Sequence, residues 1–177
     1  MLLRKTSTYQ GFTLTELLVA LAVGAVLAAV AAPGFASLRH RAALAASTNG
    51  ILGALYFAQR SAARTGVPAV FCLTSGTGQC TGGMAEAPAW QVFLDTSGSS
   101  ALRPASSGVA IAKATLEGGT RIRGTRSAIT FWPAARAGTT ATFTVCDPRD
   151  STSASAVIVN ETGRPRVVAA EGSACAS

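Results

Sequence analysis

Residues 11–33 read GFTLTELLVALAVGAVLAAVAAP, and between Phe12 and Ala32 this segment contains one ionisable side chain, Glu16. At a rise of ~1.5 Å per residue, about 20 apolar residues in a helix span the hydrocarbon core of a bilayer. The sequence therefore predicts a transmembrane helix at residues 12–32.

The residues before this helix predict its orientation and its processing. Arg4 and Lys5 precede it, whereas residues 33–38, which follow it directly, include no basic side chain. By the positive-inside rule, the first residues stay in the cytoplasm and the rest of the chain is translocated. A secretory signal peptide has a shorter apolar region that ends at its cleavage site, whereas here the cut is expected before the apolar run, between Gly11 and Phe12. Residues 1–11 are thus expected to be a cleaved leader, and the helix remains in the mature protein.

Glu16 is the unusual residue of the apolar helix. A carboxylate inside a membrane span costs several kcal/mol and normally marks a function or a partner. After cleavage, the new α-amino group of Phe12 would lie one helical turn from Glu16, and the amino group of a neighbouring subunit can neutralise that carboxylate. The alternative is an acid tolerated at the first turn of a helix, where it suits the helix dipole. The surrounding residues favour the functional interpretation.

Those residues, 11–19, resemble the class III signal of type IV pilins and type II secretion pseudopilins. The resemblance implies that prepilin peptidase cleaves after Gly11, that Phe12 is then N-methylated, and that Glu16 governs entry into a filament of other pilins. Pro33 matches the helix-kinking proline of that family. The family also implies a subunit held in the bacterial inner membrane with its head in the periplasm, and later an extracellular pilus.

The helix is predicted to continue well beyond the membrane. Apolar residues recur at helical spacing from Leu38 to Ala62, and Gly66 and Pro68 are typical of a helix end. A helix over residues 12–65 would be about 80 Å long at ~1.5 Å per residue, which is more than a globular domain needs.

Residues 66–177 form the predicted β-rich globular head. Short β-type segments alternate there with clusters of Gly, Ser, Thr and Pro, and we expect loops at residues 74–89 and 95–107. A long helix packed on an antiparallel sheet is an α+β fold of the type IV pilin kind. The predicted strands lie at residues 67–73, 90–94, 109–114, 121–123, 128–131, 140–146, 156–160 and 164–168.

Four cysteines lie in the part of the chain predicted to be outside the cytoplasm, where disulfides form. Four cysteines allow three connectivities, and we favour Cys72 with Cys80 and Cys146 with Cys175, which would pin the C-terminal tail to a strand. A zinc site is the competing interpretation. The absence of a Cys-x-x-Cys pair and the position of His40, the sole histidine, argue against it.

The sequence predicts no catalytic residues, no cofactor and no metal, and therefore no enzyme. His40 is expected at a helix surface, away from any candidate nucleophile. Asp147 and Asp150 flank a predicted turn, where acids more often cap or solvate loops. The glycines at Gly76 and Gly78 do not have the spacing of a phosphate loop, and no helix follows them.

The chain is basic, with 15 Lys and Arg against 8 Asp and Glu. Removal of Arg4 and Lys5 with the leader leaves 13 against 8. A surplus of this size is compatible with a polyanionic ligand. The alternative is a codon bias that enriches Arg, Ala and Gly, and composition alone does not separate the two.

The arginines of the C-terminal half are the candidate ligand contacts. Arg164 and Arg166 would share one side of a strand, about 7 Å apart, which matches successive phosphates along a nucleic-acid strand. Pro165 between them suits an edge strand. The absence of an aromatic residue beside them favours phosphate contact over base stacking. The alternative is that these arginines only pair with acidic neighbours, namely Glu161, Glu171 or Asp147.

A second cluster, Arg121, Arg123 and Arg126, is added from charge alone, with Arg121 and Arg123 on one strand face. For these three, DNA contact and simple solvation are about equally supported.

Residues 163–166, Gly-Arg-Pro-Arg, resemble the Gly-Arg-x-Arg motif of FimT-type minor pilins, which share a head with GspH pseudopilins. The resemblance implies that Arg164 and Arg166 bind double-stranded DNA, presented by a turn at Gly163, during DNA uptake for natural transformation. The alternative function is a structural tip component of a type II secretion system that binds no nucleic acid.

Overall fold

The computed structural model describes residues 11–76, 78–81, 86–96, 108–134 and 140–175. The chain divides into two compact units, residues 1–39 and residues 40–177, and the boundary falls inside one long helix. The second unit is called the head unit below. The leader and much of the predicted loops at 74–89 and 95–107 lie outside the described residues.

Helix α1, Leu14–Thr65, begins with a reciprocal cap between Thr13 and Glu16. The backbone N–H of Thr13 donates to Glu16 Oε2 at 2.9 Å, and the backbone N–H of Glu16 donates to Thr13 Oγ1 at 3.3 Å. A Thr and a Glu three residues apart at a helix start satisfy two of the N–H groups that lack a partner in the first turn. Glu16 thus caps the helix of its own chain, and these hydrogen bonds with Thr13 were not predicted.

The first part of α1 has the length and composition of a membrane span. Leu14–Ala32 has a mean hydropathy of 2.3, and none of this segment is buried. Nineteen helical residues cover about 28 Å at ~1.5 Å per residue, close to the thickness of a bilayer core.

The helix ends at a glycine, as predicted. Gly66 has a φ of 69°, and its N–H donates to the carbonyl of Ala62 at 3.1 Å. Only glycine adopts this left-handed conformation without strain, so Gly66 terminates α1 and turns the chain toward the first strand.

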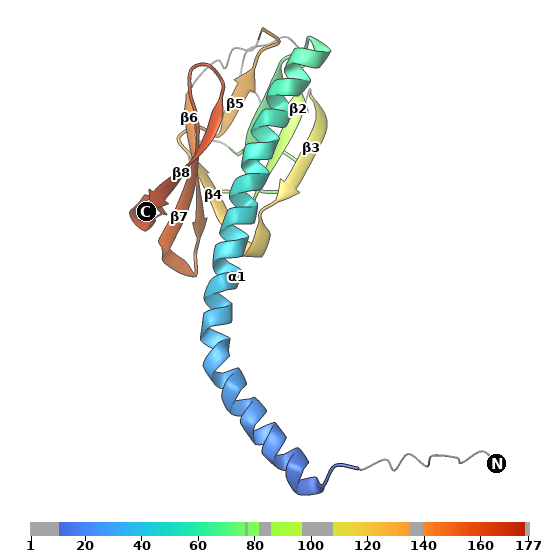
Figure 1. Ribbon diagram of the computed structural model, residues 1–177. Coiled ribbons are helices and arrows are strands. Elements are labelled where there is room, and N and C mark those ends of the chain that lie inside the picture. The colour runs from blue at the N-terminus through green and yellow to red at the C-terminus, as the bar shows by residue number, and fades with distance from the viewer. Residues whose placement is uncertain (1–10, 77, 82–85, 97–107, 135–139, 176–177) are drawn as a thin grey trace, which may run out of the picture. The chain divides into compact units, whose positions relative to one another are not determined.

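Two four-stranded antiparallel sheets make up the rest of the head unit (Figure 1). Sheet A has the order β3-β2-β1-β5 and sheet B the order β4-β6-β7-β8. The strands of sheet A are β1 Ala69–Thr74, β2 Ala89–Leu94, β3 Val109–Thr115 and β5 Ala128–Phe131. Those of sheet B are β4 Arg121–Gly124, β6 Ala141–Asp147, β7 Asp150–Val159 and β8 Pro165–Glu171. Two short 3-10 helices, η1 Glu117–Gly119 and η2 Gly172–Cys175, complete the described elements.

The core lies where both sheets meet the second half of α1. Ile51 and Leu55 of the helix are fully buried in one cluster with Phe71 of β1 and Phe143 of β6. The rings of Phe71 and Phe143 meet edge to face with centroids 5.1 Å apart, which joins sheet A to sheet B. Every described residue that is buried lies at Ser47 or later. The head unit therefore contains its whole core and is expected to fold without residues 1–39.

Two disulfides cross-link the head unit. Cys72 of β1 is bonded to Cys80, and Cys146 of β6 is bonded to Cys175 of η2. This is the pairing favoured from the sequence. The second bond attaches the end of the described chain to the middle of sheet B.

The predicted α+β fold, a long helix on antiparallel sheet, is confirmed. All eight strands form close to the predicted positions, but β7 begins at Asp150, six residues before its predicted start at Ala156. The additional residues are mainly Ser and Thr, which give no alternating pattern. Ser153, Ala154 and Ser155 pair with the last residues of β8, and Asp150 pairs with Asp147 of β6.

Candidate nucleic-acid interface

The turn between β7 and β8 is held by Asn160. Its side-chain Oδ1 accepts the N–H of Arg164 at 2.9 Å, and its carbonyl accepts the N–H of Gly163 at 2.9 Å. Gly163 has a φ of 76°, a conformation that disfavours any residue with a Cβ. The backbone that leads into the arginine pair is thus fixed by local hydrogen bonds.

Arg164 and Arg166 are both exposed, and the residue between them is buried. Pro165 pairs with Val159 on the core side of β8, so the two arginines share the opposite side, as predicted. Within the described part of the chain, neither guanidinium forms an ion pair or a side-chain hydrogen bond. Both charges are therefore available to a ligand.

An aromatic residue does lie beside this pair, contrary to the expectation from the sequence. The hydroxyl of Tyr56, on α1, donates to the carbonyl of Pro165 at 3.2 Å. The two residues are 109 positions apart, so local sequence contains no signal for this contact. Tyr56 anchors the start of β8 to the helix.

The arginines of β4 lie on the same face of sheet B as Arg166. Ile122, between Arg121 and Arg123, is fully buried in the core, so both arginines lie on the outward face of β4. At β8 the buried Pro165 defines the core side in the same way. The outward face of sheet B thus carries cations on both of its edges.

The two edges are separated by β6 and β7. At ~4.8 Å per strand, β4 and β8 lie about 14 Å apart. Arg166 is also displaced along the sheet from the β4 arginines, because Val168 lies opposite Arg123 and Ala170 opposite Arg121. The strip between the two edge strands carries Thr142 and Thr144 of β6 and Ala156 and Ile158 of β7. The structure therefore does not join the two sequence clusters into one, but places them on either side of an uncharged strip.

The three arginines of the second cluster differ from one another. Arg123 Nη2 pairs with Glu86 Oε1 at 3.0 Å, which neutralises part of its charge. Arg121 is exposed on β4, and Arg126 is exposed in the turn that leads to β5. Neither forms an ion pair with any acidic residue that the structure describes, so Arg121 is the strongest of the three candidates.

The acidic residues expected to neutralise Arg164 and Arg166 do not do so in the described structure. Glu171 lies on β8 at an odd-numbered position, on the opposite side from Arg166, and accepts a hydrogen bond from Ser173 at 3.4 Å. Asp147 already pairs with Arg149 and lies 3.0 Å from His40 Nδ1. The described residues therefore do not support the alternative that Arg164 and Arg166 only form ion pairs with acidic neighbours.

A separate cluster joins α1 to the end of β6. His40 Nδ1 lies 3.0 Å from Asp147 Oδ2, and Arg149 Nε donates to Asp147 Oδ1 at 2.9 Å. Arg149 Nη2 also donates to the carbonyl of Gly118. His40 lies on the helix, as expected, but it is half-buried, and its contact with Asp147, 107 residues away, was not predicted. Asp147 does cap its turn, since its Oδ1 accepts the N–H of Arg149 at 3.0 Å.

Asp147 makes the head unit sensitive to acid. The hydrogen bond from the Arg149 guanidinium, aided by the Arg149 N–H and His40 and opposed by burial, lowers the pKa of Asp147 from 3.8 to about 2. A pKa depressed on folding stabilises the folded state above the unfolded pKa, and this contribution, about 2 kcal/mol, is lost as the pH falls from 4 toward 2.

Thermal melts of the head unit and its Asp147→Asn variant between about pH 6 and pH 2 test this linkage. We expect the wild type to be the more stable at the upper end and the two Tm values to converge at the lower end. A difference that stays constant over this range would show that Asp147 stabilises the fold without titrating.

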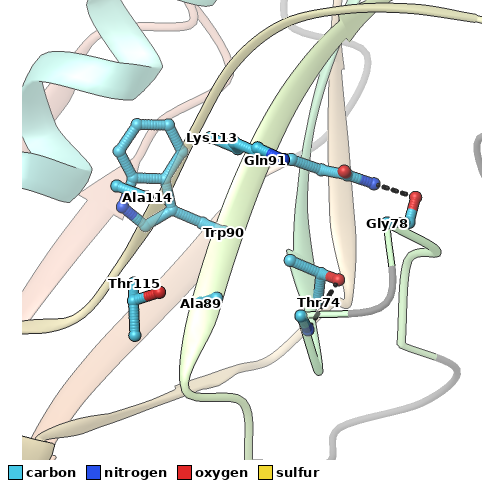
Figure 2. A pocket seen from close by; sticks show the side chains of 9 residues that line it. Thr74, Gly78, Ala89, Trp90, Gln91, Lys113, Ala114 and Thr115 are labelled. Carbon is cyan, nitrogen blue, oxygen red and sulfur yellow. Dashed lines mark hydrogen bonds between the residues drawn. The ribbon is translucent and has the colours of Figure 1, made fainter.

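A recess on the outward face of sheet A, about 380 Å³ in volume, is the second candidate site (Figure 2). Gln91 Nε2 donates to the Gly78 carbonyl at 2.9 Å and closes one side of the recess. Among its described lining residues Lys113 is the one ionisable side chain. No group of three His, Cys, Asp or Glu that could hold a metal occurs among the described residues. The recess therefore offers polar contacts but no acid–base pair or nucleophile.

Comparison with known proteins agrees with the fold. A family model described as type II transport protein GspH matches residues 47–163, and a model of the prokaryotic N-terminal methylation motif matches residues 6–32. No curated protein matches the chain. The first model ends immediately before Arg164, so the arginine pair lies outside the matched segment.

Solved structures of a minor pilin and of a minor pseudopilin are similar to the chain. A crystal structure of the type IV minor pilin FimU of Pseudomonas aeruginosa is 13% identical, with a TM-score of 0.53, over 77% of this chain and 94% of that one. The minor pseudopilin EpsH from the Type 2 Secretion System of Vibrio cholerae is 12% identical, with a TM-score of 0.52, over 71% of this chain and 96% of that one. At these identities the likeness establishes the fold.

The methylation motif includes the membrane-length segment Leu14–Ala32, and the fold of the chain is similar to those of the minor pilin and the minor pseudopilin. With a family model that covers most of the head, these findings show that the chain belongs to the GspH family of type IV pilin-like proteins.

Proposed function

We propose that this protein is a FimT-like minor type IV pilin whose head binds double-stranded DNA without sequence preference, for DNA uptake in natural transformation. The observation that carries the proposal is the pair Arg164 and Arg166, exposed, preorganised by the turn at Gly163, and unpaired among the described residues.

The outward face of sheet B supports a duplex as the ligand. Its two edge strands are about 14 Å apart, similar to the ~12 Å width of the major groove of B-DNA, so the arginines of each edge can contact the phosphates of one strand. Threonine hydroxyls between the rows add hydrogen bonds to phosphate or sugar. Contacts of these kinds position DNA but do not read its bases, so the binding is non-specific.

In this proposal, the leader and the helix bring the head into the pilus. Prepilin peptidase cuts between Gly11 and Phe12, Phe12 is N-methylated, and the subunit waits in the inner membrane with its head in the periplasm. Glu16 then meets the amino group of a neighbouring pilin during assembly into the extracellular pilus. In the isolated chain the carboxylate of Glu16 accepts from Thr13, so that contact must be exchanged or shared on assembly.

A DNA mobility shift with the oxidised head unit tests the proposal. We expect binding to duplexes of unrelated sequence with similar affinity, and a linear fall of log K with log salt. Absence of binding at about 50 mM salt, or affinity that does not change with salt, would refute the assignment.

The second candidate function is that of a structural pseudopilin at the tip of a type II secretion filament. It is favoured by the match to the GspH model and by the likeness to EpsH. It predicts that the head unit binds another pseudopilin and leaves DNA unbound, so the same mobility shift separates the two.

A further inference from the structure

The exposed side of α1 in the head unit carries an aromatic residue followed by two cations. Phe57 is 40% exposed, and Arg60 and Arg64 follow it at three and seven residues, which places them along one face of the helix. Together with Ser61 these residues line a groove of about 350 Å³. Among the described residues, no acidic side chain pairs with either arginine.

This groove adjoins the arginine pair of β8. Tyr56, immediately before Phe57, donates its hydroxyl to the carbonyl of Pro165, the residue between Arg164 and Arg166. Arg60 lies one helical turn beyond Tyr56, about 6 Å along the axis, and Arg164 lies one residue beyond Pro165 toward the turn. The β7–β8 turn points toward the end of the head unit where α1 ends (Figure 1). A strand that leaves Arg164 can therefore continue over Arg60.

We propose that the Phe57–Arg60–Arg64 groove is a second DNA contact, which holds a single-stranded extension next to the duplex bound by Arg164 and Arg166. This inference rests on the proposed function. An unpaired base stacks on the exposed ring of Phe57, while Arg60 and Arg64 contact the adjoining phosphates. An aromatic ring at the start of a row of cations is a combination by which proteins hold single strands of any sequence. The head unit thereby prefers DNA with a frayed or single-stranded end over blunt duplex.

A purely structural role would explain only part of this face. Arg64, in the last turn of α1, is favourable to the helix dipole wherever its side chain points. Phe57 contributes to no buried cluster, since its neighbours Ala54 and Ala58 fill the core at that level. Replacing Phe57 should therefore leave the fold intact and reveal its contact with a ligand.

The test compares a blunt duplex of about 30 base pairs with the same duplex carrying a single-stranded tail of about eight nucleotides, bound to the head unit by fluorescence anisotropy. We expect the tail to increase wild-type affinity about 10-fold. Phe57→Ala should abolish that increase and change blunt-duplex affinity less than about two-fold, whereas Phe57→Trp should retain it, because stacking needs only an aromatic face.

Single-charge variants provide the matched control. Arg60→Ala should reduce tailed-duplex affinity more than Arg41→Ala, which removes an equal charge from an exposed position on the same helix about 28 Å away. Equal loss in these two variants, or a Phe57→Ala variant that still prefers tailed DNA, would overturn the inference.

The inference and the proposed function fail separately. A wild type that binds duplex through Arg164 and Arg166 without any preference for a tail rejects the groove alone. A wild type that binds neither DNA rejects both.

Discussion

Replacing Arg164 and Arg166 together by alanine is expected to weaken the binding of the head unit to duplex DNA by about 10- to 100-fold at ~100 mM salt. Both guanidiniums are exposed and without an ion pair in the described structure, so their removal takes away ligand contacts without breaking internal ones. Each lost phosphate contact also lowers the slope of log K against log salt by about 0.9, so the double variant should show a slope smaller by about 1.8.

The control for this variant is the pair Lys113→Ala with Arg41→Ala. It removes the same total charge from two exposed positions, one on sheet A and one on α1. If both double variants lose affinity equally, attraction to the whole basic head is sufficient, and the arginine pair has no special role. Arg164→Lys with Arg166→Lys should keep most of the salt slope while losing the planar, bidentate contact that arginine makes with phosphate.

The second large effect concerns stability. Phe143→Ala is expected to cost the head unit about 4 kcal/mol and to lower its Tm by about 15 °C. Phe143 is fully buried, meets Phe71 edge to face, and lies directly beneath Gly124, where a Cβ would approach its ring at 3.0 Å. Its removal leaves a cavity where, among the described residues, an aromatic contact joins the two sheets.

Calorimetry or circular dichroism of the oxidised head unit measures this loss. Val109→Ala is the control, because Val109 is 61% exposed on the edge strand β3 and its truncation should cost less than about 0.5 kcal/mol. A loss below about 1 kcal/mol for Phe143→Ala would mean that the two sheets do not depend on this contact.

Much of the fold could be predicted because its signals are local. The apolar run, the glycine at position 66 and the alternation within β6 each act over a few residues. The start of β7 at Asp150 could not be predicted, since the residues before Ala156 are mostly small and polar, and they pair with distant residues of β8 from Ser153 onward and with Asp147 of β6 at Asp150. The division of the strands into two sheets could not be predicted either, because it depends on pairing between segments that are distant in the sequence.

The candidate site also combines features that could be predicted from the sequence with features that could not. The exposure of Arg164 and Arg166 follows from period-two alternation around Pro165, and it was predictable. The contacts of Tyr56 with Pro165 and of His40 with Asp147 join residues more than 100 positions apart, and no spacing in the sequence indicates them. The ion pair with Glu86 makes Arg123 a weaker candidate, and no spacing in the sequence indicates this contact either.

The two attachments of β8 have a mechanical consequence. In the proposed function, a retracting fibre that pulls on bound DNA loads the head at Arg164 and Arg166, beside the edge strand β8, whose one neighbouring strand in the described structure is β7. A strand pulled in this way separates from its neighbour beginning at the loaded end. At the start of β8, Tyr56 hydrogen-bonds Pro165 and so couples this end to α1. Beyond the other end of β8, the Cys146–Cys175 disulfide stops the separation. In this proposal, the load applied by bound DNA is transmitted through Tyr56 to α1, and the head keeps its fold under that load.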